Sequence, residues 1–425
     1  MTAKPPEDLD QVLPIGWPRT PFWTQYRRVK RRATGNEELL SVYRDHGVIL
    51  KTDRDDNFNK ASEDLTTYQV VRVGDLVVNK MKAWQGSVAV SGHSGIVSPA
   101  YFVFESLGTN HPQFMHYLLR SAPYVAAYAA ASKGIRPGQW DLDPGVLRSF
   151  PVPVLSTAEQ VRIADFLDRE TAEIDAFIAD QEELIGLLNE RRTATITHAV
   201  TKGLDASAPM KSSGLGTVDT IPASWDVWPF THYAPHRVDY RGATPTKVSG
   251  GIPLVTARNV KAGYIDYESS AEYVAPESYA DTMRRGTPEL GDVLLTMEAP
   301  LGNVALVDRT DIALAQRLVK FRVKAGADPR FAVFAMISSY FQQQLLSRAT
   351  GSTALGIKAS KLSELRIAVP SDGEQKAISD YLERETAELD ATIADALEVI
   401  ALSKERRVAL ISAAVTGKLD VSGRA

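Results

Sequence analysis

The sequence predicts an α+β protein made of two copies of one unit, each a mixed α/β body followed by a long helix. Two observations support this prediction. Segments 159–205 and 374–420 align without a gap at a constant offset of 215 residues, and about 28 of their 47 positions are identical. The chain before each copy holds short stretches rich in β-branched and aromatic residues, which are typical of strands. A chain of 425 residues can form several domains with separate cores.

Composition excludes several classes of protein. Hydrophobic residues make up 44% and charged residues 24%, the balance of a globular rather than a disordered chain. No apolar run approaches the roughly 18 residues that span a bilayer, and the first residues lack the hydrophobic stretch of a signal peptide. Because the chain has no cysteine, it has no disulfides, thiolate zinc sites or cysteine nucleophiles. We therefore expect a cytoplasmic protein with no membrane contact.

The two bodies cover residues 13–158 and 219–373, and both start with a similar motif, LPIGW in the first and IPASW in the second. Each body is expected to contain four strands, a helix and a closing strand. In the first body these are residues 68–73, 75–78, 87–90, 101–104, 114–131 and 149–154. In the second they are residues 252–255, 293–296, 304–307, 318–323, 330–348 and 365–369.

The repeated segments predict helices over residues 159–204 and 374–420, separated from the second body by a Ser/Gly-rich linker, 205–218. An ordinary amphipathic helix lying on its own body is the alternative for a single copy. Two matched copies of this length favour a helix pair, antiparallel because the unit is repeated. One heptad register runs through both, and its apolar members form the predicted seam: Leu167, Ile174, Ile178, Ile185, Leu188, Leu382, Leu389, Ile393, Ile400 and Leu410.

Charge is segregated between the helices and the bodies. The formal net charge of −4 would argue against binding to nucleic acid. The two helical segments, however, carry 21 acidic and 11 basic residues, so the rest of the chain has a net charge of +6. Residues 19–32 alone contain six basic residues and no acidic one. A solvated basic face is one explanation, and an anionic ligand of the bodies is the other.

Catalytic motifs are missing from the sequence. It contains no phosphate-binding loop, no H-E-x-x-H, no G-x-S-x-G and no dinucleotide-binding fingerprint. The seven histidines do not follow metal-ligand spacing, and Pro235 lies between His232 and His236. We therefore predict no catalytic and no metal-binding residues in this chain.

Several motifs, in a fixed order, resemble those of the specificity (S) subunit of type I restriction-modification systems. They include R-G-A-T-P at 241–245, GIPLVTARNVK at 251–261 and GDVLLTMEAPLGNVAL at 291–306. The pattern L-x-x-L-x-I-x-V-P-x-x-x-E-Q-x-x-I follows at 362–378, and T-G-K-L-D ends the second helix. The first body departs from the pattern, with residues 40–47 in place of PLVTARNV and Ser98-Pro99 in place of Ala315-Gln316.

This resemblance implies that the bodies are target recognition domains and that each reads one half of a bipartite site on double-stranded DNA. The helices would set the spacer between the halves and dock two methyltransferase (M) subunits. The M subunits would use S-adenosylmethionine to methylate adenine. Motor-nuclease (R) subunits would cut unmodified DNA with ATP and Mg. None of these cofactors is expected to bind this chain.

DNA-contacting residues are expected in loops of both bodies, because Arg, Lys, Asn and Gln can pair with base edges and hydroxyls can hold phosphates. Candidates in the first body are Lys80, Lys82, Trp84, Gln85, Lys133, Arg136, Gln139 and Trp140. Candidates in the second are Arg241, Thr244, Arg258, Asn259, Lys261, Gln316, Arg317, Ser352, Thr353, Lys358 and Lys361.

Two further hypotheses remain. A protein-interaction scaffold would use the helices to assemble partners and the bodies to bind proteins, and its affinity for DNA would be negligible. A hydrolase would need a cluster of acidic or histidine residues that the sequence does not display.

Overall fold

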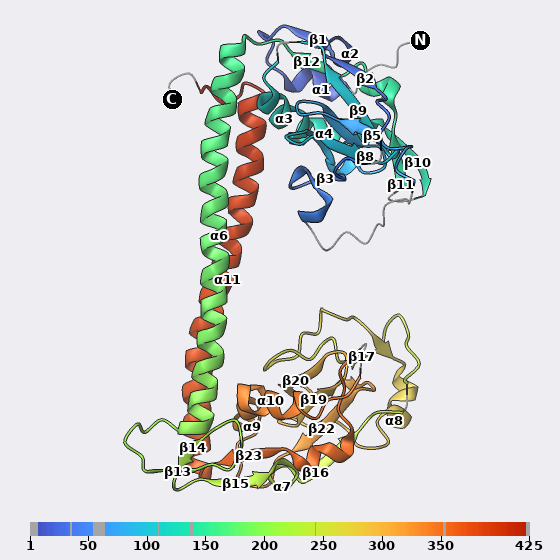
Figure 1. The fold of residues 1–425 in the computed structure, drawn as a ribbon. Coiled ribbons are helices and arrows are strands. Elements are labelled where there is room, and N and C mark those ends of the chain that lie inside the picture. The colour runs from blue at the N-terminus through green and yellow to red at the C-terminus, as the bar shows by residue number, and fades with distance from the viewer. Residues whose placement is uncertain are drawn as a thin grey trace. The chain divides into compact units, whose positions relative to one another are not determined.

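The computed structural model describes residues 7–34, 36–53, 64–108, 110–136, 139–242, 244–351 and 354–421. The chain forms two compact units, and each holds one body with parts of both long helices, α6 (Thr157–Lys202) and α11 (Asp372–Val415). The first unit comprises the residues up to Glu182 and those from Leu397 on, and the second comprises Glu183–Ala396. The elements of each unit are labelled in Figure 1.

The first body follows the chain from α1 to β12. Its helices are α1 (Glu7–Val12), α2 (Phe22–Gln25), α3 (Pro112–Arg120), α4 (Ala122–Ala131) and α5 (Pro144–Leu147), with 3-10 turns η1 (Lys51–Asp53) and η2 (Ala83–Gln85). Its strands are β1 (Arg19–Pro21), β2 (Tyr26–Val29), β3 (Leu40–Tyr43), β4 (Gly47–Leu50), β5 (Gln69–Val71), β6 (Leu76–Asn79), β7 (Val88–Val90), β8 (Gly95–Val97), β9 (Tyr101–Ser106), β10 (Ser132–Arg136), β11 (Gln139–Leu142) and β12 (Pro151–Pro153).

The second body follows the chain from β13 to β23. Its helices are α7 (Phe230–Tyr233), α8 (Tyr279–Thr282), α9 (Pro329–Ile337) and α10 (Ser339–Leu346), with 3-10 turns η3 (Pro276–Ser278) and η4 (Ala359–Glu364). Its strands are β13 (Met210–Ser212), β14 (Thr220–Pro222), β15 (Asp226–Pro229), β16 (His236–Asp239), β17 (Ile252–Val255), β18 (Tyr273–Val274), β19 (Val293–Met297), β20 (Leu301–Leu306), β21 (Ala313–Leu314), β22 (Leu318–Arg322) and β23 (Arg366–Val369).

Both bodies are built on the same antiparallel four-stranded sheet. Its strand order is β2-β9-β6-β7 in the first body and β16-β22-β19-β20 in the second. In each body the strand near the start pairs with the strand before the long helix, β1 with β12 and β15 with β23. The repeat inferred from sequence therefore extends to the topology of the bodies.

Each predicted body helix is divided in two by a serine. Ser121 separates α3 from α4, and Ser338 separates α9 from α10. Both serines have extended backbone angles, and their hydroxyls donate to a carbonyl three residues earlier, in Leu118 and Ala335. Such a hydroxyl competes with the backbone for a helical acceptor, and Pro123, two residues after Ser121, has no backbone N–H with which to continue α3.

The Glu-Gln pair repeated in both copies fixes the start of each long helix. Glu159 accepts hydrogen bonds from the backbone nitrogen and hydroxyl of Ser156, which is a capping box. Gln160 and Gln375 are buried and bond to the adjoining body. Gln160 accepts from the backbone of His111, and Gln375 accepts from the hydroxyl of Tyr233 at 2.7 Å. The pair therefore anchors each helix to its body.

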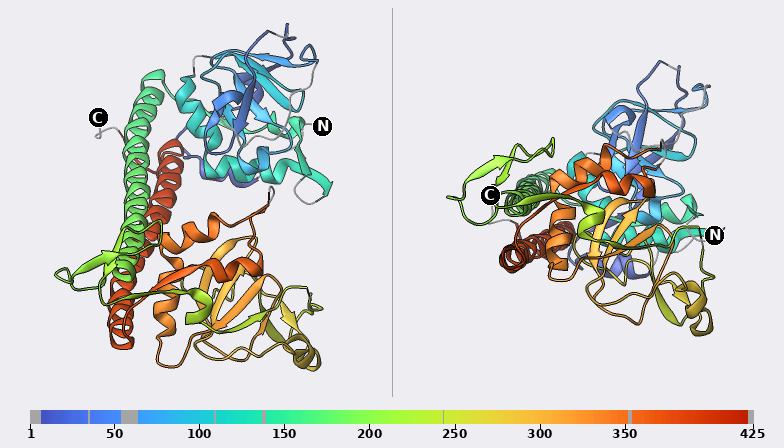
Figure 2. Two further views of the ribbon diagram at one scale, coloured as in Figure 1. Left: turned by 60° about the horizontal axis from the view of Figure 1, so that its bottom comes forward. Right: turned by 90° about the horizontal axis from the view of Figure 1, so that it is seen from below.

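The two long helices pack antiparallel, as the sequence predicts, and Figure 2 shows them side by side in two further views. A bidentate ion pair joins them in each unit, Asp175 to Arg407 in the first and Arg192 to Asp390 in the second. Arg192 and Arg407 are equivalent residues of the repeat, as are Asp175 and Asp390. The repeat therefore places the same pair in both units, with the roles of the helices exchanged.

All ten predicted seam residues are buried or half-buried. Leu167, Ile174, Ile178, Leu382, Leu389 and Ile400 are buried, and Ile185, Leu188, Ile393 and Leu410 are half-buried. Leu167 and Leu410 also pack against the core of the first body, and Leu382 belongs to the core of the second. The helix ends thus serve both the helix pair and the bodies.

The segment predicted as a linker, 205–218, is partly structured. It contains β13, which pairs with β14, and the side chain of Leu215 is only 8% exposed in the second core. The β13–β14 pairing and the burial of Leu215 together hold this Ser/Gly-rich stretch on its body. Among the described residues, no helix is long and apolar enough to cross a membrane.

Candidate nucleic-acid interface

In the second unit, four loops at one edge of the four-stranded sheet hold most of the predicted DNA-contacting residues. Arg241 follows β16, forms an ion pair with Asp239 at 2.6 Å and donates to the carbonyl of Ile357. Hydrogen bonds that the guanidinium of Arg241 donates to Asp239 raise the pKa of Arg241, so the guanidinium stays charged. Thr244 donates to the side-chain oxygen of Gln316 at 2.9 Å. Residues far apart in the sequence therefore form one polar surface.

Arg285 fixes the loop that bears Arg241 and Thr244. Its Nη1 atom donates to the carbonyls of Asp239 and Arg241, at 2.8 and 2.6 Å. A small pocket of about 180 Å³ adjoins this loop, and its lining includes Thr244, Arg284 and Arg285. The lining also includes Asp281, which forms an ion pair with Arg284 at 3.0 Å, so the hydroxyl of Thr244 and the guanidinium of Arg285 are the groups of this pocket that suit an anion such as phosphate.

Arg317 lies on the same surface in a strained backbone conformation. Its φ is +77°, and its exposed side chain forms an ion pair with Glu298 at 3.1 Å. The backbone of Glu298 forms an isolated antiparallel β-bridge with that of Gly356, in the loop that precedes η4. Because positive φ is uncommon for arginine, the surrounding loops determine where this side chain points.

Asn259 is a correction to the predicted set. It is 1% exposed, and all its hydrogen-bonding capacity serves its own loop. Its side-chain oxygen accepts from the nitrogen and hydroxyl of Thr256, and its amide donates to the carbonyls of Asp266 and Ser270. A fully bonded and buried amide cannot read a base, so Asn259 shapes the loop instead.

The other candidates of the second unit fall into three groups. Arg258 and Lys358 are exposed, whereas Lys261 donates to the carbonyl of Arg258 and Lys361 forms an ion pair with Glu364. Ser352 and Thr353 lie outside the described residues.

In the first unit, basic side chains gather over the ring of Phe102. The guanidinium carbon of Arg28 lies 4.4 Å from the ring centroid and the Nζ atom of Lys80 lies 5.0 Å from it. Burial, Arg28 and Lys30 together lower the pKa of Lys80, against a smaller opposing effect of Asp141. The excess of positive charge at this point favours an anion.

The remaining candidates of the first unit lie on η2 and on the β10–β11 hairpin. Trp84 packs on Trp140 with a centroid distance of 4.9 Å, and its indole nitrogen donates to the carbonyl of Met81. Lys82, Gln85 and Lys133 are exposed. Arg136 and Gln139 are paired in the backbone of the hairpin, but their side chains lie outside the described residues.

Sequence reasoning did not single out Arg28, Lys30, Arg237, Arg284 and Arg285 as DNA-contacting residues. The basic run at residues 19–32 was a signal for the first two, but the run also includes Arg27 and Arg31, which the structure pairs with acidic residues. Which residues of the run are paired depends on the acidic residues that the fold brings next to them, and the sequence alone does not show this.

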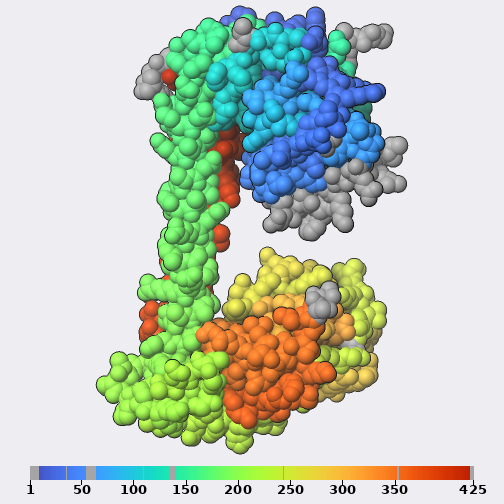
Figure 3. All heavy atoms as spheres, viewed as in Figure 1, coloured from blue at the N-terminus to red at the C-terminus, as the bar shows by residue number. Residues whose placement is uncertain are grey.

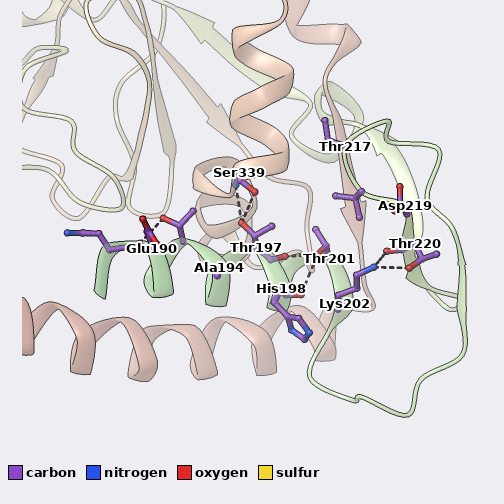
Figure 4. Close-up of a pocket in the computed structure, with 13 residues that line it drawn as sticks. Glu190, Ala194, Thr197, His198, Thr201, Lys202, Thr217, Asp219, Thr220 and Ser339 are labelled. Atoms are coloured by element: carbon purple, nitrogen blue, oxygen red, sulfur yellow. Dashed lines mark hydrogen bonds between the residues drawn. The ribbon is translucent and has the colours of Figure 1, made fainter. Parts of the chain in front are cut away.

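A second pocket, of about 890 Å³, lies along the last turns of α6 in the second unit and holds none of the predicted DNA-contacting residues. Figure 4 shows its lining, in which Thr197 and Ser339 share a hydrogen bond and Lys202 donates to Thr220. These side chains hold α6 to the second body. Among the described residues, no group of three or more acidic or histidine residues could hold a metal ion.

Comparison with known proteins gives a consistent result. The family described as "Type I restriction modification DNA specificity domain" matches residues 245–399. The MjaVIII specificity subunit of a type I restriction enzyme from Methanocaldococcus jannaschii is 24% identical over 369 residues, which cover 82% of this chain and 81% of that protein.

Two solved structures share the fold. One, reported for the complex assembly and conformational transition of the type I R-M system, has a TM-score of 0.63 at 17% identity and covers 96% of this chain and 99% of its own. The HsdS subunit from Thermoanaerobacter tengcongensis has a TM-score of 0.50 at 17% identity, covering 96% and 98%.

Proposed function

The chain is a specificity subunit of the type I restriction-modification family, a non-catalytic DNA-recognition subunit, and from this premise we propose how its two units divide the work. Each body reads one half of a bipartite site on double-stranded DNA. The two long helices set the spacer between the halves and dock two methyltransferase subunits. Motor-nuclease subunits join this complex.

One observation above the others supports two separate readers. The two bodies share a sheet of the same strand order, yet the loops at its edge carry different side chains, Arg241, Thr244 and Gln316 in one and Lys80 and Trp84 in the other. A shared scaffold with divergent polar loops is what two half-sites of different sequence require.

The outer face of the two long helices supports the proposal that two copies of one partner bind this chain. Several exposed positions on the side away from the seam are identical in both copies of the repeat, and Leu187 and its equivalent Leu402 are each 56% exposed. Figure 3 displays the uncovered side of α6. Burial within this chain does not explain an exposed leucine in both copies, whereas binding of the same protein twice does. Further exposed identities include Ala172 and Ala387, Ala176 and Ala391, Ala179 and Ala394, Glu183 and Glu398, and Glu190 and Glu405.

The cofactors of the reaction belong to the partners in this proposal. S-adenosylmethionine binds the methyltransferase subunits, and ATP and Mg bind the motor-nuclease subunits. This chain recognises the DNA sequence and binds none of these cofactors.

Sequencing of modified bases tests the recognition role. The chain is expressed with its methyltransferase, and the host genome is sequenced for methyladenine. We expect a split motif, with two short defined halves around a fixed unspecified gap. A continuous motif would mean that one body does not read DNA. Absence of modification by an intact complex would instead favour a protein scaffold.

A matched deletion tests the spacer role. Removing residues 179–185 of α6 and 394–400 of α11 takes one heptad from each helix and keeps both cross-helix ion pairs in register. The frame shortens by about 10 Å at 1.5 Å per residue, so the gap in the motif should lose about one to three base pairs. Both defined halves should stay the same. The control deletes only 179–185, which breaks the register and should destabilise the chain. An unchanged gap in the matched deletion would contradict the spacer role.

A further inference from the structure

Arg28 and Arg237 occupy the same position in the two bodies. Both lie on the edge strand of the four-stranded sheet, β2 in the first body and β16 in the second. Arg28 is opposite Phe104, which is opposite Leu76 in β6. Arg237 is opposite Phe321, which is opposite Val293 in β19. The register therefore makes the two arginines equivalent, although the sequences around them differ.

The surroundings of the two arginines are also equivalent. In the first body, the backbone nitrogen of Leu142 donates to the carbonyl of Lys80, whose amine shares the Phe102 ring with Arg28. In the second body, the nitrogen of Ile357 donates to the carbonyl of Met297, and Arg237 donates to the carbonyl of Ala359 at 3.3 Å. Each arginine thus lies near the point where the end of β6 or β19 hydrogen-bonds to the segment that leads to the closing strand, β12 or β23.

Both arginines are accessible to an anion outside the chain. Both are exposed, and neither forms an ion pair with any residue that the structure describes. Lys30 and Lys80 lie beside Arg28, and the exposed Lys358 is next in sequence to the acceptor of Arg237. Asp239 interacts electrostatically with Arg237, but it forms its ion pair with Arg241. An arginine held by a ring or a carbonyl and left without a carboxylate can still donate to an oxyanion.

We propose that Arg28 and Arg237 each bind a phosphate of the DNA backbone and position their domains on the duplex in the same way. This inference rests on the proposed function and adds a division of labour to it. The edge-strand arginines give binding that does not depend on sequence, and the loops that differ between the bodies read the bases. A backbone contact common to both domains requires a common position in the fold, which base-reading residues do not.

The test uses the complex of the full chain with its methyltransferase subunits. Affinity for the cognate duplex and for an unrelated duplex of equal length is measured between 50 and 200 mM KCl. The variants are Arg28→Gln, Arg237→Gln and the double substitution. Because each phosphate contact contributes about 0.9 to the slope of log K against log salt, each variant should lower the slope by about that amount. Affinity should fall about 5-fold to 10-fold on both duplexes, and the methylated motif should stay unchanged.

Arg27→Gln is the matched control. Arg27 lies on the same strand and is exposed, but it forms an ion pair with Glu105 at 2.7 Å, and its loss removes the same formal charge. Its salt slope should stay within about 0.3 of wild type, a third of one contact. An equal effect of Arg27→Gln and Arg28→Gln, an unchanged slope for Arg28→Gln, or a change of motif would overturn the inference. Failure of the proposed function would look different, because the wild-type complex would then bind both duplexes equally.

Discussion

The two units pair an equivalent buried carboxylate with cations from different positions in the fold. In each body a Gly-Asp turn places a carboxylate under the sheet, where Asp75 is 4% exposed and Asp292 is fully buried. Asp75 pairs with Arg31, which comes just after the edge strand. Asp292 pairs with Lys320 and Arg322, both on β22. The fold requires a buried acid and a cation near it, but it does not fix which strand supplies the cation.

The contacts between body and helix differ in the same manner. In the first unit the carboxylate of Asp168 on α6 accepts from two uncharged side chains, those of Gln113 and Tyr117. In the second unit Arg330, the equivalent of Gln113, forms ion pairs with Asp380 and Glu383 on α11. The two units therefore share the backbone arrangement of the repeat, whereas the charges of the side chains at equivalent positions differ.

The largest difference between the units should come from the buried acids. We expect Asp292→Asn to destabilise the second unit by about 3 kcal/mol, because Lys320 stays buried without a carboxylate. Asp75→Asn should cost the first unit about 1 kcal/mol, since Arg31 is 18% exposed and keeps Glu105 as a partner. Urea unfolding with hydrogen exchange of β6 and β19 measures both. Equal losses would show that the source of the cation does not matter.

A difference in acid stability should follow from His116 on α3, which the second unit replaces by Val333. Burial, with a smaller effect of Arg120, lowers the pKa of His116 to about 4. The unfolded histidine titrates near 6.5, so this stability is complete above that pH and falls as the pH drops from 6.5 to 4. The first unit should lose about 2 kcal/mol between pH 8 and pH 5.

His116→Val should remove most of that loss, and hydrogen exchange of α3 peptides, corrected for intrinsic rates, measures it. Val333→Ala, in the equivalent place, should leave the pH dependence of the second unit unaltered. A pH dependence retained in His116→Val would assign the acid sensitivity to another group.

The contacts between body and helix should respond differently to salt. Arg330→Ala should destabilise the second unit by about 1–2 kcal/mol, because three carboxylates lose their shared partner. That loss should shrink in 1 M KCl, where the Debye length falls to about 3 Å. Gln113→Ala should cost about 0.5–1 kcal/mol at either salt concentration, since the bond is between an amide and a carboxylate. Chemical denaturation at two salt concentrations gives both values, and a salt-insensitive Arg330→Ala would contradict the comparison.

The cross-helix ion pairs should show the smallest effect and no difference between units. Double-mutant cycles on Asp175 with Arg407 and on Arg192 with Asp390 should each give a coupling of about 0.5 kcal/mol, because the carboxylates are half exposed. Couplings that differ by more than about 0.5 kcal/mol would mean that the repeat does not preserve the helix packing.

The sequence predicted the helices and the order of the elements better than it predicted the DNA-contacting surface. Heptads and the repeat are local patterns, and they located the seam from Leu167 to Leu410. Asn259 is a candidate from sequence because an asparagine in a loop can pair with a base edge, but its burial depends on carbonyls up to eleven residues away. Arg28 and Arg237 could not be matched from sequence, because their equivalence lies in the register of strands about 75–85 residues apart.

The claim that the two bodies read DNA independently can be tested most directly by sequencing methyladenine in hosts that carry a loop variant of one body. Thr244 and Gln316 bond to each other, and neither belongs to a hydrophobic core cluster of the second body. In the double variant Thr244→Ala, Gln316→Ala, we expect one half of the split motif to become degenerate and the other half, with the gap, to stay as in wild type. Degeneration of both halves, or loss of the gap, would contradict independent reading by the two bodies.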